Sequence, residues 1–302
     1  METDAPSCLL GNDSTPAAAK GTGEVIAFAA ERRGFRSSGY CLSVLERRVR
    51  ERIVSAGAAG VEEYLRLLES DPSELDLLVE ALTVKVSAFF RDPLVFEYLN
   101  ELVFPTLLAR KGAEGNRSVR VWSAGCAGGE EPYSVAILLH ELSRREIPPV
   151  DVTIFATDVD ERALARGREA LYPASAVANV RHGILSSSFR PEADSWRVLP
   201  EVARLVRFSV HDLLDGRTAA PAESIFGTFD LVLCRNVLIY FDAAAQAAAL
   251  SALVRSLAEG GHLLLGQTES PPGPWRERLR RVNDFCSLWV KPAAAAARMD
   301  PR

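Results

Sequence analysis

The stretch that decides the fold is Val119–Leu139, which reads VRVWSAGCAGGEEPYSVAILL. It opens with a short apolar run containing β-branched residues, which is typical of a buried strand. A turn of small residues follows from Ser123 to Gly129, and three of them are glycine. Glu130-Glu131-Pro132 then begins a run with apolar residues at helical spacing, and proline in a first turn favours a helix start. A strand, a small-residue turn and a helix predict the first half of a nucleotide-binding crossover, where glycines let the backbone approach a ligand closely.

The two carboxylates after the turn indicate which kind of ligand this loop takes. Glu130 and Glu131 stand where a pyrophosphate would dock on a helix N-terminus, and they would repel it. A cationic or zwitterionic ligand fits better, and S-adenosylmethionine carries both an ammonium group and a sulfonium. Taken alone, the loop is equally consistent with a tight strand-to-helix turn in any α/β protein.

Composition excludes several classes of protein. With 48% hydrophobic residues among 302, the chain can fill a substantial core. The net charge of -5 and the pI near 5.6 speak against general affinity for nucleic acid. The five cysteines form no CxxC pair and the four histidines are isolated, so we expect no metal site and a reducing, cytoplasmic environment. No apolar run approaches the roughly 18 residues of a transmembrane helix, so we expect no membrane insertion.

Periodicity divides the chain into segments. Residues 1–23 and 292–302 are rich in small and polar residues, and we expect them to be disordered. Residues 24–110 show helical spacing throughout and predict a small all-α N-terminal domain. Residues 111–291 alternate strands with helices, which predicts a parallel sheet with crossovers. Within them, residues 171–205 exceed what one crossover needs and predict an inserted subdomain. The predicted strands cover residues 119–122, 152–156, 206–210, 229–234, 262–266 and 282–290, the last of them as an antiparallel edge.

Positive charge is concentrated in the expected helical domain of this acidic protein. One predicted helix carries an apolar stripe, with Arg47, Arg48 and Arg50 on its remaining surface. A run of charge is usually only a solvated face. Because further arginines lie just upstream, we favour a docking surface for an acidic partner.

Polar groups follow several of the predicted strands. Ligands of open α/β sheets bind outside the carboxyl ends of the strands. A single aspartate in such a place is more often a helix cap or a loop residue. Several polar groups converging on one edge favour an adenosine site, with one acidic group for the ribose hydroxyls and another for the adenine amino group. These groups are Asp158, Asp212 and the Arg235-Asn236 pair.

Five segments, taken together, resemble one protein family. They are VSAFFRDP (Val86–Pro93), VWSAGCAGGEEPYS (Val121–Ser134), FATDVD (Phe155–Asp160), FDLVLCRNVLIYFD (Phe229–Asp242) and GGHLLLGQTES (Gly260–Ser270). The chain resembles the CheR-type chemotaxis receptor methyltransferases, which methylate glutamate side chains. FFRD, GEEPYS and CRNVLIYF in this order make the resemblance highly specific. It covers nearly everything from the helical domain to the last strand.

The resemblance implies an α/β, Rossmann-like S-adenosylmethionine-dependent methyltransferase fold. It adds a small all-α N-terminal domain and a small β subdomain inserted in the sheet domain, which can help dock on receptors. The implied activity is protein-glutamate O-methylation with S-adenosylmethionine as donor and S-adenosylhomocysteine as product. The implied partner is the cytoplasmic domain of chemoreceptors, docking through Arg47, Arg48 and Arg50 of the basic helix. We expect a monomer with no nucleic-acid partner.

The resemblance also implies the site. It makes Arg91 and Tyr240 the catalytic residues, although Arg91 is also consistent with a helix-start arginine paired with Asp92, and Tyr240 with a packed aromatic. The sequence departs from the family where Asp212 replaces an asparagine and where Gly125-Cys126 stand in place of alanines. Lys85 likewise stands where better-known members have an asparagine. The residues placed against the donor are Lys85, Ser87, Arg91, Glu130, Asp158, Asp212, Leu213, Cys234 and Arg235.

Two other functions stay open at this stage. One is a methyltransferase with a different acceptor, and the other is a cofactor-binding regulatory module. The fourth predicted strand is followed by CRNVLIYF, without an aromatic-proline motif, which argues against base methylation. The presence of both Arg91 and Tyr240 argues against a purely regulatory module.

Overall fold

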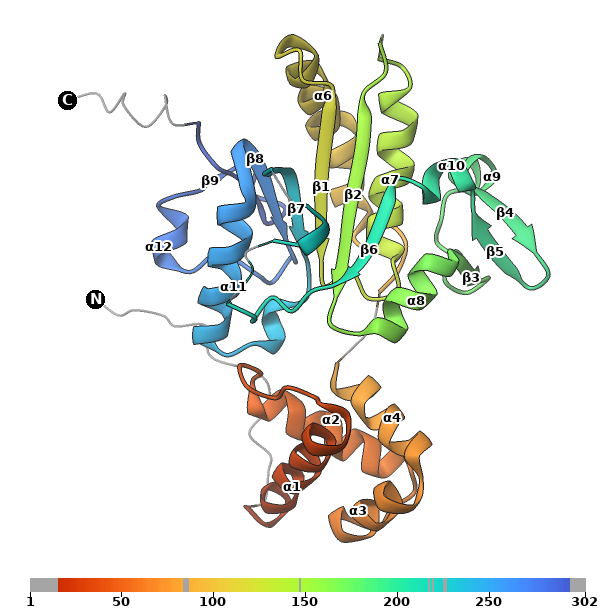
Figure 1. The fold of residues 1–302 in the computed structure, drawn as a ribbon, viewed down its shortest axis with the longest axis vertical. Helices are drawn as coiled ribbons and strands as arrows, with labels where there is room; N and C mark the ends of the chain where they lie inside the picture. Colours follow the sequence, from red (N-terminus) through yellow and green to blue (C-terminus); the bar gives the residue numbers. More distant parts are fainter. Residues whose placement is uncertain are drawn as a thin grey trace. The chain divides into compact units, whose positions relative to one another are not determined.

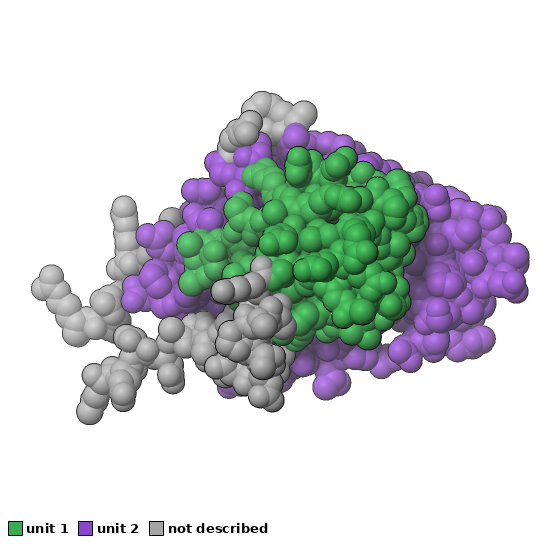
Figure 2. All heavy atoms as spheres, turned by 90° about the horizontal axis from the view of Figure 1, so that it is seen from below, with its two compact units in different colours: residues 1–85, 240–245 green, residues 86–239, 246–302 purple. Residues whose placement is uncertain are grey.

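The chain divides into two compact units in a computed structural model. Residues 1–85 and 240–245 form the first unit, and residues 86–239 and 246–302 form the second (Figure 2). The structure describes residues 16–83, 87–146, 148–216, 218, 220–224 and 227–293, with side chains from residue 21 onward.

The first unit is helical. The apolar stripe of α2, Leu45, Val49 and Ile53, is buried in a core shared with the other helices of this unit. Asp71 caps α4 by accepting a hydrogen bond from the backbone of Ser73 (2.8 Å). The helices are α1 (Pro16–Arg33), α2 (Leu42–Ser55), α3 (Val61–Ser70) and α4 (Pro72–Leu82) (Figure 1).

A buried carboxylate ties three of these helices together. Glu74 of α4 accepts hydrogen bonds from Arg52 Nη2 of α2 (2.6 Å) and from the Tyr64 hydroxyl of α3 (2.7 Å). Burial raises the pKa of the Glu74 carboxyl, but the bonds from Arg52 and Tyr64 outweigh this and hold the pKa below its usual value. Arg52 therefore serves the core of the unit, unlike the arginines at 47, 48 and 50.

Two predicted boundaries are wrong. Disorder was expected for residues 1–23 and 292–302, of which 1–15 and 294–302 lie outside the described residues. Within the described part α1 begins at Pro16, and its residues Thr22 and Val25 are fully buried. The helical domain was expected to run to residue 110, yet α5 (Pro93–Tyr98), the π-helix η1 (Leu99–Val103) and α6 (Phe104–Ala113) belong to the second unit. Their apolar residues pack into the same core as β1, which helical periodicity alone cannot reveal.

The second unit is built on a sheet of order β6-β2-β1-β7-β8-β10-β9 (Figure 1). β6, β2, β1, β7 and β8 are parallel, and β10 is antiparallel to both β8 and β9. From β1 the chain adds strands on one side and then, from β7, on the other, so the strand order reverses between β1 and β7. Ligands of open α/β sheets bind at such a point. The strands are β1 (Ser118–Ala124), β2 (Asp151–Asp158), β6 (Val206–Val210), β7 (Phe229–Cys234), β8 (Leu257–Leu265), β9 (Arg280–Arg281) and β10 (Leu288–Val290).

The parallel sheet with helical crossovers confirms the predicted fold class. β6 and β7 have the predicted bounds, whereas β8 begins at Leu257 instead of His262. The last strand was predicted for residues 282–290, yet β10 covers only Leu288–Val290, and β9 forms the edge. The other helices of this unit are α7 (Glu130–Ser143), α8 (Glu161–Glu169), η2 (Ala222–Ser224), η3 (Leu238–Tyr240), α11 (Ala243–Ser256) and α12 (Gly273–Arg276), of which η3 and α11 extend into the 240–245 segment of the first unit.

A small β subdomain lies between α8 and β6, as predicted for residues 171–205. Its antiparallel strands have the order β3-β5-β4. Its elements are β3 (Leu171–Pro173), α9 (His182–Ser188), β4 (Phe189–Glu192), β5 (Ser195–Val198) and α10 (Pro200–Ala203). Among the described residues, no helix is both long enough and apolar enough to cross a bilayer.

Candidate active site

The loop between β1 and α7 is fastened to the end of β2. The backbone N–H groups of Gly125 and Cys126 both donate to the carbonyl of Thr157, at 2.7 and 2.9 Å. Gly125 and Gly129 have φ values of +74° and +96°, which favour glycine. A Cβ at Gly125 would stand 2.5 Å from the Val237 side chain, so no larger residue fits there. Backbone therefore forms the surface of this loop, as a closely approaching ligand requires.

Glu130 brings an unsatisfied carboxylate oxygen to the loop. Its Oε2 atom is buried without a hydrogen-bond partner, and a Cβ at Gly128 would stand 3.0 Å from it. Burial raises the pKa of this carboxyl, against smaller lowering effects that include a hydrogen bond from Ser87. A buried acceptor left unpaired is costly. A positively charged donor group, such as the ammonium of S-adenosylmethionine, would satisfy it.

Asp158 lies on the other side of the same loop. Its Oδ2 accepts from the backbone of Ala127 (2.9 Å), and its Oδ1 accepts from the backbone of Asp160 (3.0 Å). The carboxylate thus holds the backbone of the loop between β1 and α7 and that of the turn after β2.

The carboxyl ends of β6 and β7 lie at the same edge of the sheet as the carboxyl ends of β1 and β2. The backbone of His211 donates to the carbonyl of Asp158 (3.1 Å), which places Asp212 and Leu213 directly beyond it. Asp212 accepts from the backbone of Leu214 (2.8 Å). β7 pairs with β1, so its last residue, Cys234, lies at the same edge. The structure thus brings together the strand-end residues that the sequence singles out.

The FFRD turn is anchored to the first turn of α7. The backbone N–H of Phe90 donates to the Ser134 hydroxyl (2.9 Å). Phe90 and Asp92 have φ values of +52° and +61°, a conformation that costs non-glycine residues energy. The anchored turn brings Ser87 to the Glu130 carboxylate and carries Arg91, which is half-buried.

Arg235 holds this turn from the side of β7. Its side chain is 2% exposed, and it donates to Glu131 Oε2 (3.2 Å), Asp92 Oδ2 (2.7 Å) and the carbonyl of Arg91 (2.8 Å). Its guanidinium also lies over the Phe96 ring, 5.3 Å from the centroid. These protein groups engage both terminal nitrogens, while the Nε atom is buried without a hydrogen-bond partner.

Two family models match the chain. Residues 85–282 match the model described as CheR methyltransferase, SAM binding domain, and residues 23–83 match CheR methyltransferase, all-alpha domain. The chain belongs to the CheR methyltransferase family. S-adenosylmethionine is therefore its cofactor, and the glycine loop and the unpartnered Glu130 oxygen fit that molecule.

Curated relatives agree with this assignment. A chemotaxis protein methyltransferase of Listeria innocua is 33% identical over 82% of this chain and 88% of its own length. Chemotaxis protein methyltransferase 2 of Pseudomonas aeruginosa is 31% identical over 89% of this chain and 93% of its own length. A probable biofilm formation methyltransferase of the same species, WspC, is 33% identical, and the match covers 78% of this chain and 54% of that protein.

Lys85 and Tyr240 are the two expected site residues that the structure does not assign to this edge of the sheet. Lys85 lies outside the described residues. Tyr240 belongs to the first unit, where its carbonyl accepts from the backbone of Cys41 (2.8 Å) and the next residue, Phe241, forms a bridge with Tyr40. The roles of Lys85 and Tyr240 stay predictions.

The cysteines of the site are not nucleophiles. Cys126 and Cys234 are 2% and 0% exposed. Burial raises the pKa of both thiols well above its usual value, so neither forms a thiolate at neutral pH. Both are small side chains packed in the interior of the second unit.

The charge argument treated Glu130 and Glu131 alike, whereas the family resemblance put only Glu130 against the donor, and the structure gives the two carboxylates different surroundings. Consecutive helical residues point about 100° apart, so only one of two adjacent glutamates can face the loop. Glu131 turns inward instead and accepts from the Ser123 hydroxyl (2.7 Å) as well as from Arg235. The helical phase of the GEEPYS segment is the signal that could have found this.

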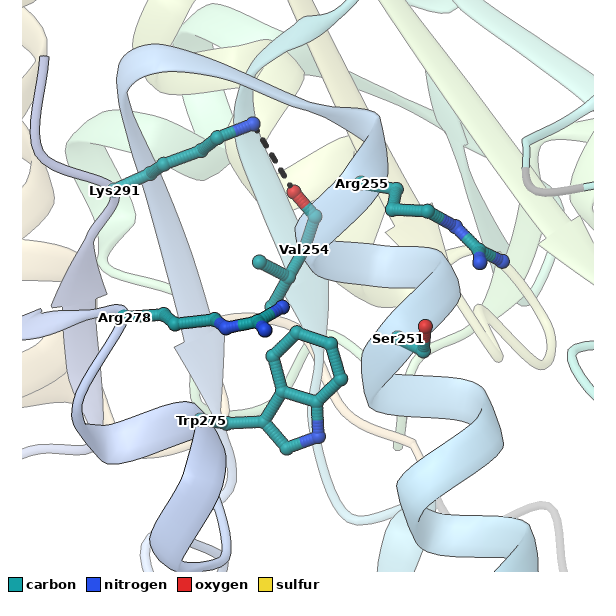
Figure 3. Close-up of a pocket in the computed structure, with 6 residues that line it drawn as sticks. All are labelled: Ser251, Val254, Arg255, Trp275, Arg278 and Lys291. Carbon is teal, nitrogen blue, oxygen red and sulfur yellow. Dashed lines mark hydrogen bonds between the residues drawn. The ribbon is translucent and has the colours of Figure 1, made fainter. Parts of the chain in front are cut away.

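A hollow of about 340 Å³ lies elsewhere in the second unit, beside α11 and α12, and contains none of the predicted site residues (Figure 3). The Lys291 ammonium donates to the carbonyls of Val254 (3.4 Å) and Leu257 (2.8 Å) at the end of α11, and the Arg278 guanidinium lies over the Trp275 ring. Both cations are thus engaged by neighbouring protein groups. The hollow is lined by Ser251, Val254, Arg255, Trp275, Arg278 and Lys291.

The glycine loop gives the first testable prediction. Gly125→Ala should weaken S-adenosylhomocysteine binding at least about tenfold, because the new methyl group collides with Val237 and the positive φ is strained. Titration calorimetry measures this. Gly112→Ala, in helix α6 with open space around it, should bind normally. Equal binding by all three proteins would show that the loop tolerates a side chain.

Proposed function

We propose that this CheR family member transfers the methyl group of S-adenosylmethionine to glutamate side chains of chemoreceptor proteins, giving methyl esters during chemotaxis adaptation. The observation that supports the proposal is the anchoring of the FFRD turn, which carries Arg91: the Ser134 hydroxyl of α7 accepts from the backbone of Phe90 (2.9 Å), and Arg235 donates to the carbonyl of Arg91 (2.8 Å). The relatives named as chemotaxis protein methyltransferases support the pathway.

The chemistry makes modest demands on the chain. A glutamate side chain, with a pKa near 4.3, is already ionised at neutral pH, so no general base is needed. Bound S-adenosylmethionine supplies an electrophilic methyl group on its sulfonium. The protein must hold the acceptor oxygen in line with that methyl group and exclude water, and such positioning can supply several kcal/mol of the barrier.

Arg91 is the residue we assign to orienting the acceptor. A guanidinium offers forked donors that match both oxygens of a carboxylate. The grip must stay moderate, because stabilising the carboxylate ground state alone would slow its attack. Tyr240 is the second residue we assign to the methyl-transfer step, on the strength of its place in the NVLIYF segment.

Methyl transfer to purified receptor fragments tests the proposal. Tritiated methyl groups should pass from the donor to the receptor and be released by mild base, because a carboxyl methyl ester is base-labile. Receptor fragments with the acceptor glutamates changed to alanine should stay unlabelled. Base-stable label, or donor binding without any transfer to receptors, would instead support a different acceptor or a regulatory module.

Arg91 should matter for turnover. Arg91→Ala should lower kcat by at least about 100-fold, the scale of one lost orienting or electrostatic contact. Arg91→Lys should fail to restore kcat, because a point charge lacks the planar fork. Single-turnover assays at saturating donor and acceptor separate this effect from weaker donor binding. Near-normal turnover of Arg91→Ala would leave Arg91 a structural residue.

The basic helix α2 should matter for the acceptor only. Arg47 and Arg48 both lie near one acid, Glu51, at 3.7 and 3.0 Å, so these two cations share the Glu51 carboxylate. Reversing Arg47, Arg48 and Arg50 to glutamate should raise KM for receptor, less so at high salt, and leave donor affinity unchanged, since exposed charges are screened within about 8 Å at physiological ionic strength.

A matched charge reversal on another surface controls this experiment. Arg144 and Arg145 follow α7, and the Arg145 side chain is 71% exposed. Their reversal to glutamate should leave KM for receptor unchanged. If both variants behave alike, α2 is only a solvated face.

A further inference from the structure

A buried carboxylate outside the predicted site holds the segment that follows β7. Glu269 is 6% exposed. Its carboxylate accepts from the backbone N–H groups of Gly266 (2.6 Å), Asn236 (2.8 Å) and Ile239 (3.2 Å). Its own carbonyl accepts from the Ser287 hydroxyl (2.6 Å), which fixes it from the other side. One side chain thus gathers three backbone donors from two separate segments.

The segment that Glu269 holds has a conformation that needs such support. Asn236 has a φ of +57°, in the left-handed region that costs a non-glycine residue energy. The chain leaves room for the carboxylate, because a Cβ at Gly266 would stand 2.6 Å from Glu269 Oε2 and 2.9 Å from the Asn236 nitrogen. The absence of a side chain at Gly266 therefore leaves the space in which the Glu269 carboxylate binds the Asn236 backbone.

The same segment touches the donor loop, which is the glycine loop between β1 and α7 (residues 125–129). Val237 lies between the two residues that Glu269 binds, and its Cγ2 atom lies 2.5 Å from where a Cβ at Gly125 would stand. Gly125 begins the donor loop with a φ of +74°. The Glu269 carboxylate holds the backbone on both sides of Val237, and the Val237 side chain in turn contacts the donor loop at Gly125.

Burying this carboxylate is unfavourable in itself. Burial raises the pKa of Glu269 above its usual value, and the bonds from backbone N–H groups lower it again only in part. A buried charge is seldom the most stable choice for a core position. What this carboxylate supplies is an acceptor that can hold several N–H donors at once.

We propose that Glu269 is a positioning residue for the methyl donor: by holding Asn236 to Ile239, it keeps Val237 against Gly125 and so sets the shape of the donor loop. Its significance for catalysis rests on the proposed function, but donor binding tests it without any acceptor.

Glu269→Gln is the first test, since it keeps the size of the side chain and removes the charge. Its amide oxygen can bind part of the donor set, and its NH₂ group opposes the remaining N–H donors. Dissociation constants for S-adenosylhomocysteine should rise at least about tenfold. Hydrogen exchange at the amides of Gly266, Asn236 and Ile239 should accelerate. A folded Glu269→Gln protein with unchanged affinity and exchange would overturn the proposal.

Asp230→Asn is the matched control for loss of a buried carboxylate. Asp230 lies near the amino end of β7, is 2% exposed, and accepts from the backbone of Arg120 (3.0 Å) and from Lys111 Nζ (2.7 Å). This variant should lower thermal stability and leave donor affinity unchanged. If Asp230→Asn weakens donor binding as much as Glu269→Gln, the effect is general destabilisation and the proposal fails.

Val237→Ala keeps the test decisive if Glu269→Gln does not fold. It removes the side chain that meets Gly125 and leaves the Glu269 bonds in place, and Val237 is only half-buried. Donor binding should weaken while the Gly266 and Asn236 amides stay protected. Unchanged donor binding in folded Val237→Ala would overturn the path through Val237. A wild-type protein that binds donor but methylates no receptor would refute the proposed function alone.

Discussion

The site depends on one buried ion network, the guanidinium of Arg235 between Glu131 and Asp92. Arg235 follows β7, Glu131 lies in the first turn of α7, and Asp92 ends the FFRD turn, so the network joins three segments far apart in sequence. Removing one partner of a buried pair typically costs about 3–5 kcal/mol, because the other charge is left uncompensated. The geometry of the site is therefore coupled to the integrity of this pair.

Glu130 and Glu131, two neighbouring residues of α7, have different partners. Glu131 compensates Arg235 and accepts from Ser123, while Glu130 keeps a buried oxygen without a partner. This unpaired Oε2 atom of Glu130 lies beside Gly128 of the glycine loop, where a hydrogen-bond donor on a cationic ligand would satisfy it. Strain is placed nearby as well, with positive φ values at Phe90, Asp92 and Asn236. Each of these lies in a segment held by a buried charged side chain, which explains how the strain is tolerated.

Sequence patterns predicted the sheet unit well where periodicity carried the information. β6, β7 and the start of α7 lie where apolar spacing and turn residues put them, and so do the aspartates at the strand ends. The domain boundary at residue 110 failed, because α5, η1 and α6 have the same helical periodicity whichever core they join. The prediction missed the start of α1 for a related reason: its sequence is alanine-rich and weakly amphipathic, so it does not indicate which side chains are buried.

The sequence by itself determined the fold class, the glycine loop and the family, because these follow from local spacing and from short motifs read in order. Only the tertiary structure decided which polar residues face a ligand and which are used internally. Arg235 and Glu130 both come from motifs that suggest ligand contact, yet protein groups engage both terminal nitrogens of Arg235, whereas one carboxylate oxygen of Glu130 is buried without a partner. Glu269 was not singled out, because its three N–H donors come from the separate segments that follow β7 and β8. A hydrogen bond between distant segments leaves no periodic trace in either of them.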